Sequence, residues 1–256
     1  MTNSGYSVIL GRQSTIKGSV SPSPNSLVIG NNSQINDSNS AVAIGNGVNI
    51  SNSSVNGVSI GMGTTIDNSI QGVVIGGGSS AKNSGAGIAI GANSEVSAAR
   101  AIAIGTITKV SAEDSISIGT GNEVKGNKSS AIGDPSYIDT TATGTHVQGN
   151  DNGTATNPIK ASESTFMGNT NLAGTTGTTG IHVVGNNNSV DSSNVMVMGN
   201  GVNVGTGLDG AVVLGHASSA DQYAAATDST INGVTFEAAG YAGNTGLNNG
   251  SIVSVG

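Results

Sequence analysis

The chain repeats one short apolar pattern, and each copy ends in a glycine. The clearest copies, residues 41–45 and 101–105, read AVAIG and AIAIG. Such glycines follow one another at intervals of 14 to 19 residues. The closing glycines are Gly11, Gly30, Gly45, Gly61, Gly76, Gly91, Gly105, Gly119, Gly133, Gly149, Gly168, Gly185, Gly199 and Gly215. A short fixed interval predicts a solenoid in which each copy is one turn of a coil.

A second apolar residue stands five positions after nearly every closing glycine. Thr154 is the exception. The series comprises Ile16, Ile35, Ile50, Ile66, Ala81, Val96, Val110, Val124, Ile138, Ala173, Val190, Val204 and Ala220. Asn, Ser and Gly, which favour turns, fill the intervals. The pattern therefore predicts an all-β parallel roll of about 14 turns with two short strands in each turn, and almost no helix.

The first strand of most turns has small or apolar residues on both of its faces. Positions −1 and −3, counted from the closing glycine, share one face, and position −2 points the other way. We expect positions −1 and −3 to fill the coil and position −2 to meet other copies of the chain, which predicts an obligate homo-oligomer. The expected seam residues are Ala43, Val74, Ala89, Ala103, Val147, Phe166, Val183 and Val197.

Composition excludes several functions. The chain has no cysteine, so disulfides, thiolate metal sites and cysteine nucleophiles are excluded. Its net charge is −7, and residues 161–256 hold six acidic and no basic side chains. This balance argues against nucleic-acid binding, which needs clustered Lys and Arg. No run of 18 apolar residues occurs, so we expect no direct membrane contact.

Catalytic patterns are absent as well. The three histidines fall in separate turns, and no nucleophile with its base, paired carboxylates or cofactor loop gathers in one place. We therefore expect no enzyme activity and no cofactor. His146 and His182 both stand at position −3, which favours neutral, hydrogen-bonded histidines at a seam, although ion binding between copies stays open. Glu95, Lys109 and Glu123 occupy position +4 in successive turns and are expected to stack as an alternating ladder.

The intervals between Gly133 and Gly185 are the irregular ones. They insert additional residues within 139–145, 155–163 and 175–180. Insertions in a solenoid lie on its surface and often bind ligands. The ligand-binding candidates are Asn157, Ile159, Lys160 and Glu163. The alternative is that these residues form a bulge without a ligand.

The AVAIG-type strands, the five-residue step to the next apolar position and the Asn/Ser bends resemble the head of trimeric autotransporter adhesins of the YadA type. This resemblance implies a left-handed roll over residues 1–220 that assembles as a homotrimer on the extracellular side of a bacterial outer membrane. Residues 221–256 resemble the small β domain called a Trp-ring, which precedes a neck. The chain has no Trp, so Phe236 or Tyr241 would supply the aromatic packing.

The leading hypothesis is therefore a surface adhesin head with a role in virulence. Its partners would be host extracellular-matrix or cell-surface proteins, or the heads of neighbouring cells. Two alternatives remain open, a spacer without a ligand within a surface fibre and the shaft of a phage or viral fibre.

Overall fold

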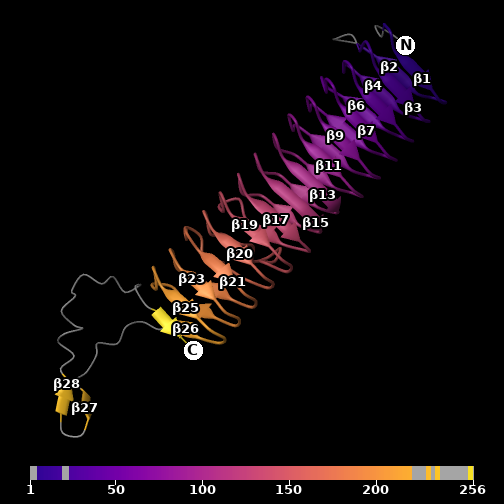
Figure 1. Ribbon diagram of the computed structural model, residues 1–256. Coiled ribbons are helices and arrows are strands. Elements are labelled where there is room, and N and C mark those ends of the chain that lie inside the picture. Colours follow the sequence, from indigo (N-terminus) through magenta and orange to yellow (C-terminus); the bar gives the residue numbers. More distant parts are fainter. Residues whose placement is uncertain (1–4, 19–22, 221–228, 232–233, 237–252, 256) are drawn as a thin grey trace.

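The protein is an elongated parallel β-solenoid (Figure 1). The computed structural model describes residues 5–18, 23–220, 229–231, 234–236 and 253–255, and no helix occurs among them. The repeating strands and the solenoid expected from the sequence are confirmed. Each strand pairs in register with its equivalents in the turns before and after it, as Ala103 does with Ala89 and Ser117.

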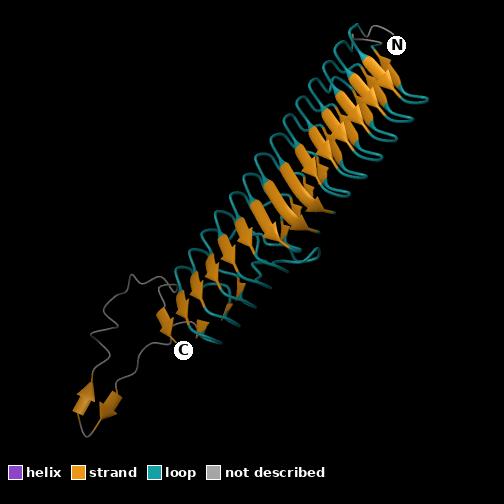
Figure 2. Cartoon of the chain, turned by 45° about the vertical axis from the view of Figure 1, so that its right-hand side comes forward, coloured by secondary structure: helices purple, strands orange, loops and turns teal. Residues whose placement is uncertain are grey.

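The fourteen strands that end at the closing glycines, together with one strand from the C-terminal end of the chain, form one sheet of fifteen strands, here called sheet 1 (Figure 2). Its last strand, from the C-terminal end of the chain, pairs in parallel with the strand before it. In order, the strands are β1 (Val8–Leu10), β3 (Leu27–Ile29), β5 (Val42–Ile44), β7 (Val58–Ile60), β9 (Val73–Ile75), β11 (Ile88–Ile90), β13 (Ile102–Thr106), β15 (Ile116–Thr120), β17 (Ser130–Gly133), β19 (His146–Gln148), β20 (Thr165–Met167), β21 (His182–Val184), β23 (Met196–Met198), β25 (Val212–Leu214) and β29 (Val253–Val255).

The strands centred on position +5 form the opposite side of the coil, here called sheet 2. It comprises a nine-stranded part and a three-stranded part, with isolated bridges at Ile159 and Leu172 between them. Its strands are β2 (Thr15–Lys17), β4 (Gln34–Asn36), β6 (Asn49–Ser51), β8 (Thr65–Asp67), β10 (Ser80–Lys82), β12 (Glu95–Val96), β14 (Lys109–Val110), β16 (Glu123–Val124), β18 (Tyr137–Ile138), β22 (Ser189–Val190), β24 (Asn203–Val204) and β26 (Ser219–Ala220).

Two further strands lie beyond the coil in the sequence. β27 (Ser229–Ile231) and β28 (Val234–Phe236) pair as an antiparallel hairpin. Phe236 is the last residue of β28, whereas Tyr241 lies outside the described residues. The expected aromatic packing of a Trp-ring therefore stays a prediction.

The interior of the coil is filled by positions −2 and +5, so the expected assignment of the two faces of sheet 1 is wrong. The eight residues expected at a seam between copies are at most 2 % exposed within the single chain and pack in its core. These residues are Ala43, Val74, Ala89, Ala103, Val147, Phe166, Val183 and Val197. The two sheets of a thin coil leave little room between them, so the mostly small residues at −2 fit inside. The larger aliphatic residues at −1 and −3 point outward.

Buried polar side chains at position +3 tie consecutive turns together. Ser33 Oγ donates to the carbonyl oxygen of Gly45 at 2.8 Å, and Asn122 Nδ2 donates to that of Gly133 at 2.9 Å. In the later turns Asn171 bridges both neighbouring turns, because its Nδ2 donates to Asn152 Oδ1 and its Oδ1 accepts from Asn188 Nδ2, both at 3.0 Å. Among the described residues only Asn49 Oδ1 is buried without a partner. The interior polar groups are thus almost fully satisfied, as a stable core requires.

One corner of the coil has the same left-handed backbone in every described turn. The residue at position −5 has a positive φ throughout, even where it is not glycine. Arg100, Asp114 and Lys128 occupy this corner in three successive turns, with φ of 55°, 56° and 57°. Few residue types other than Gly, Asn and Asp favour this conformation, so the corner is imposed by the stacking of the turns.

Candidate interaction surfaces

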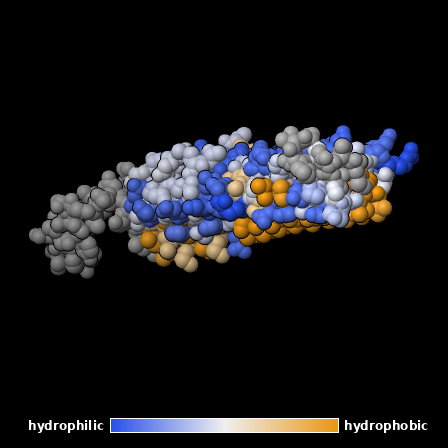
Figure 3. Space-filling model, turned by 90° about the horizontal axis from the view of Figure 1, so that it is seen from above, coloured by the Kyte–Doolittle hydropathy of each residue, from blue (hydrophilic) through white to orange (hydrophobic). Residues whose placement is uncertain are grey.

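The outer face of sheet 1 carries a double row of mostly apolar side chains. Positions −1 and −3 of each turn form it, and aliphatic residues occupy both positions from β1 to β15. Ile118 remains 39 % exposed and Met198 53 % exposed although their neighbours in the sheet cover them from two sides. Figure 3 shows apolar residues gathered along one edge of the rod. This face was expected inside the coil and instead faces outward.

The apolar face is large for a single chain. Fourteen turns spaced by about 4.8 Å give a face about 65 Å long and about 10 Å wide, or roughly 650 Å², of which the uninterrupted aliphatic turns from β1 to β15 make up roughly 380 Å². Monomeric soluble proteins rarely expose a contiguous apolar patch above about 300–600 Å². An interface between two proteins buries about 800 Å² on each partner. The face therefore has the chemistry of a protein interface and approaches the size of one.

One polar block interrupts this face. Ser130, His146, Thr165 and His182 occupy position −3 in four successive turns, and Gln148 takes position −1 beside His146. Ser130 Oγ and His146 Nδ1 are hydrogen bonded at 2.9 Å. A shallow depression of about 180 Å³ lies over β17, β19 and β20 at this place. His146 and His182 are exposed on the outer face of the single chain.

The outer face of sheet 2 is polar. Glu95, Lys109 and Glu123 are paired neighbours on β12, β14 and β16, so the stack expected from the sequence is confirmed. A second depression, of about 230 Å³, lies along this ladder. Glu123 forms its ion pair with Lys125 of the same turn, at 3.0 Å, rather than with Lys109 in the turn before. The rod is thus amphipathic, with one apolar and one polar sheet face.

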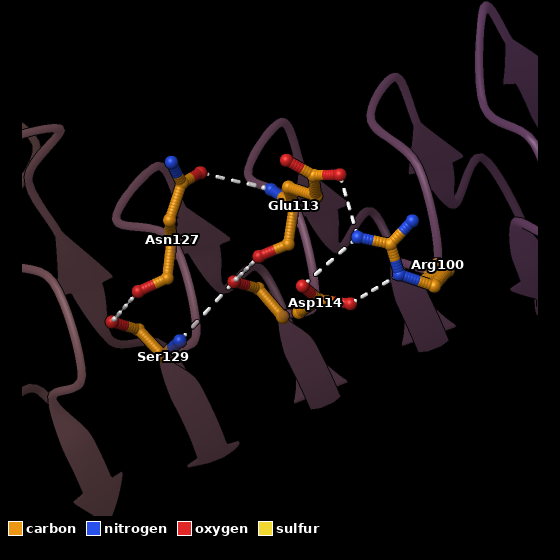
Figure 4. A network of polar contacts seen from close by, with 6 residues as sticks. Arg100, Glu113, Asp114, Asn127 and Ser129 are labelled. Carbon is orange, nitrogen blue, oxygen red and sulfur yellow. Dashed lines mark hydrogen bonds and ion pairs between the residues drawn. The ribbon is translucent and has the colours of Figure 1, made fainter.

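The corner at position −5 carries a charged network (Figure 4). Arg100 binds Glu113 at 2.6 Å and Asp114 at 2.5 Å, both in the next turn. The hydrogen bond from Arg100 lowers the pKa of Asp114, and Lys128 in the following turn lowers it further. All of these side chains are solvent-exposed, so the network adds little stability and mainly favours the register of the turns. The sequence pattern did not indicate this network, because position −5 has no common residue type.

The structure relocates the insertion between Gly149 and Gly168. Gly153 takes position +4, since its N–H donates to the Asn171 carbonyl oxygen at 2.9 Å, and Ile159 takes position +5 by pairing with Ile138. The additional residues are therefore 154–158, five residues that form a loop. Thr154 breaks the apolar series only because the loop displaces Ile159 by five positions.

The four ligand-binding candidates do not form one site. Ile159 is fully buried in the core, so its expected role in ligand contact is wrong. Asn157 lies on the exposed loop, where its N–H donates to Thr154 Oγ1 at 2.9 Å. Lys160 follows Ile159 in the chain, whereas exposed Glu163 belongs to the −5 corner with φ of 49°. Of the four, only Asn157 lies on the loop, and Lys160 stands two residues after it.

Lys160 acts on Asp139 in the preceding turn. Partial burial raises the pKa of Asp139, but hydrogen bonds from Thr141 and Thr140 and the charge of Lys160 outweigh it, so the net pKa is lowered. Asp139 Oδ1 accepts from the Thr141 N–H at 3.0 Å and from its hydroxyl at 2.9 Å. This carboxylate holds the bend that follows β18, which gives it a structural role beside the loop.

Within the part of the chain that the structure describes, no three His, Asp or Glu side chains gather closely enough to hold a metal ion. The same residues include no helix with the length and hydropathy needed to cross a membrane. No model of a known protein family matches the chain, and no curated protein sequence matches it either. The surfaces described above are therefore the basis for any functional assignment.

Proposed function

We propose that the chain is the head of a bacterial surface adhesin and that it acts as a homotrimer. The observation that supports this proposal is the apolar outer face of sheet 1, which extends along the described coil on both sides of the polar block. Covering that face would remove roughly 650 Å² of mostly apolar surface from water on each chain.

Further copies of the same chain are the occupants that suit this face best. Its side chains repeat at the spacing of the turns, about 4.8 Å, over a length of about 65 Å. A parallel copy repeats with the same spacing over the same length, so its side chains stay in step along the whole face. Apart from the polar block, the face carries no hydrogen-bonding groups that would select a different partner. The number of three chains follows from the resemblance to the trimeric adhesins.

Assembly through sheet 1 would leave sheet 2 and the corners on the outside of the rod. The polar ladder of Glu95, Lys109 and Glu123 and the loop of residues 154–158 would then each be presented three times. Repeated weak contacts to a matrix or cell-surface protein strengthen one another because the second contact forms at high effective concentration. This multivalent arrangement suits attachment through a broad surface better than binding in a single pocket.

A spacer within a surface fibre is the second candidate function. The intervals between Gly91, Gly105, Gly119 and Gly133 are uniformly 14 residues, so no loop projects from these turns. A rod of this kind could hold another domain away from a cell without binding a ligand itself. The two candidates differ in whether the isolated rod adheres to anything.

The proposal is tested by coating beads with the purified chain and measuring adherence to cultured cells and to immobilised matrix proteins. Ile118→Asp places a carboxylate on the outer face of β15 and is expected to abolish assembly and to reduce adherence at least tenfold. Thr65→Asp, on the outer face of β8 in sheet 2, is the matched control and is expected to preserve assembly. Wild-type beads that adhere no better than uncoated beads would contradict adhesion and favour the spacer.

A further inference from the structure

Only two titratable residues lie on the outer face of sheet 1 within the described coil, and both are histidines. Positions −1 and −3 from β1 to β25 carry aliphatic residues, methionines, Ser130, Thr165, Gln148, His146 and His182. No Asp, Glu, Lys or Arg occupies these positions. The charge of this face is therefore set by the two imidazoles alone.

The outward residues next to each imidazole on sheet 1 are uncharged, whereas Glu163 is a carboxylate at the neighbouring −5 corner, where it lies against Gly144. His146 on β19 is paired with Ser130 on β17 and Thr165 on β20, and Gln148 is the other outward residue of its strand. No carboxylate on these strands faces His146 to stabilise a charged ring.

His182 on β21 has still more apolar neighbours. It is paired with Thr165 on β20 and Met196 on β23, and the remaining outward side chains of these three strands are Met167, Val184 and Met198. A copy of the chain that covers these exposed apolar residues also covers His182. The same copy covers His146 two strands away, because both histidines lie in the same row of the face.

An imidazole takes up a proton between about pH 8 and pH 5, and burial without a counter-charge favours its neutral form. Neutral His146 is hydrogen bonded to Ser130 and is compatible with a covered face. A protonated ring would introduce a buried, unpaired positive charge, and symmetry would repeat it in every copy. Proton uptake and assembly through this face therefore oppose each other.

We propose that His146 and His182 make assembly through sheet 1 acid-sensitive, so that the copies associate at neutral pH and separate in acid. This inference rests on the proposed homo-oligomer and adds a regulatory condition to it. The separation would begin at the polar block, because the aliphatic rows of β1 to β15 contain no group that titrates.

The test is sedimentation equilibrium of the whole chain between pH 8 and pH 5. Each proton taken up when the copies separate weakens association by up to about tenfold per pH unit. We expect the wild-type chain to associate at least about tenfold more weakly at pH 5 than at pH 8. The double variant His146→Gln/His182→Gln keeps a polar, uncharged side chain at both positions and should lose most of this difference.

His216 supplies the control. It follows the closing glycine Gly215 at a corner, outside positions −1 and −3, so His216→Gln should retain the wild-type pH dependence. Wild-type association that is equally strong at pH 8 and pH 5 would overturn the inference and leave the oligomer intact. A double variant that dissociates in acid as the wild type does would also overturn it. A monomer at pH 8 would instead overturn the proposed assembly and this inference with it.

Discussion

Gly105 lies directly against the carbonyl oxygen of Gly119, its equivalent in the next turn. A Cβ atom placed on Gly105 would be 1.7 Å from that oxygen, which no side chain tolerates. Gly105 also has φ of 135°, a conformation that L-residues rarely adopt. The recurring glycine therefore follows from the close stacking of backbones at this corner.

Replacing Gly105 by alanine should destabilise the coil by at least about 3 kcal/mol, because the clash is with backbone and both turns must move apart. Gly63→Ala is the matched control, since Gly63 has φ of 66° but a Cβ atom placed there would meet no atom within 4 Å. The control should lose only about 1–2 kcal/mol. Urea unfolding of both variants measures the difference, and equal losses would contradict the backbone clash.

The buried amide of Asn171 should be essential to the later turns. Asn171→Ala removes the side-chain hydrogen bonds to Asn152, Asn188 and the Gly185 carbonyl oxygen. Asn152 Oδ1 keeps the Asn171 N–H and Asn188 Nδ2 keeps the Gly199 carbonyl oxygen, but the Asn188 N–H and the Gly185 carbonyl oxygen lose their bonds to this amide. We expect the free energy of unfolding to fall by about 2–4 kcal/mol. Asn171→Ser should lose less, because serine at the equivalent position Ser33 donates to a glycine carbonyl oxygen at 2.8 Å. Similar losses for Ala and Ser would contradict a role for the amide network.

Ile107 is a strained position that can be improved. It is β-branched yet has φ of 57°, and its side chain is 54 % exposed. Asn32 and Asn93 take the same place in other turns. Ile107→Asn should therefore stabilise the chain by about 1 kcal/mol. Ile70→Asn, at a residue also 54 % exposed but without positive φ, should not. Thermal unfolding measures the stability of both variants. Equal stabilisation of the two would show that the gain comes from replacing an exposed apolar side chain and not from relieving backbone strain.

The ion pairs at the −5 corner should stabilise the fold only at low salt. Arg100→Gln removes the ion pairs to Glu113 and Asp114, all between exposed side chains. The pKa of Asp114 is lowered in the folded chain. Its contribution to the free energy of unfolding is therefore present above the usual carboxyl pKa and is lost as the pH falls through the lowered value. We expect a small decrease in Tm at pH 7 in low salt, and none in high salt or in strong acid. A decrease in Tm that persists in high salt would contradict this prediction, because it would show that the Arg100 side chain stabilises the fold by packing and not by its ion pairs.

The loop of residues 154–158 should be removable. Its deletion joins Gly153 at position +4 directly to Ile159 at position +5 and converts a 19-residue turn into a 14-residue one. We expect an unchanged circular dichroism spectrum and a Tm within a few degrees of the wild type. If the loop contacts a ligand, adherence falls while the fold survives. Unfolding of the deletion variant would contradict the position assigned to the insertion.

Period and strand positions could be predicted from the sequence, because glycine and the apolar residues recur at fixed intervals. The direction of the faces could not be read from alternation alone, since positions −1, −2 and −3 are all apolar in most turns. Side-chain size was the usable signal: Ala43 and Ala103 suit a thin interior better than their Ile neighbours do. Ile159 was misplaced because counting cannot locate an insertion within a turn. The −5 corner was missed because Arg100, Asp114 and Lys128 share only a backbone conformation.

The mass of the chain in solution at pH 8 tests the central claim most directly, that copies of the chain cover the outer face of sheet 1. Sedimentation equilibrium should give three times the 24.8 kDa of one chain for the wild type and a single chain for Ile118→Asp. A wild-type mass of one chain at every concentration, with the fold intact by circular dichroism, would contradict the account.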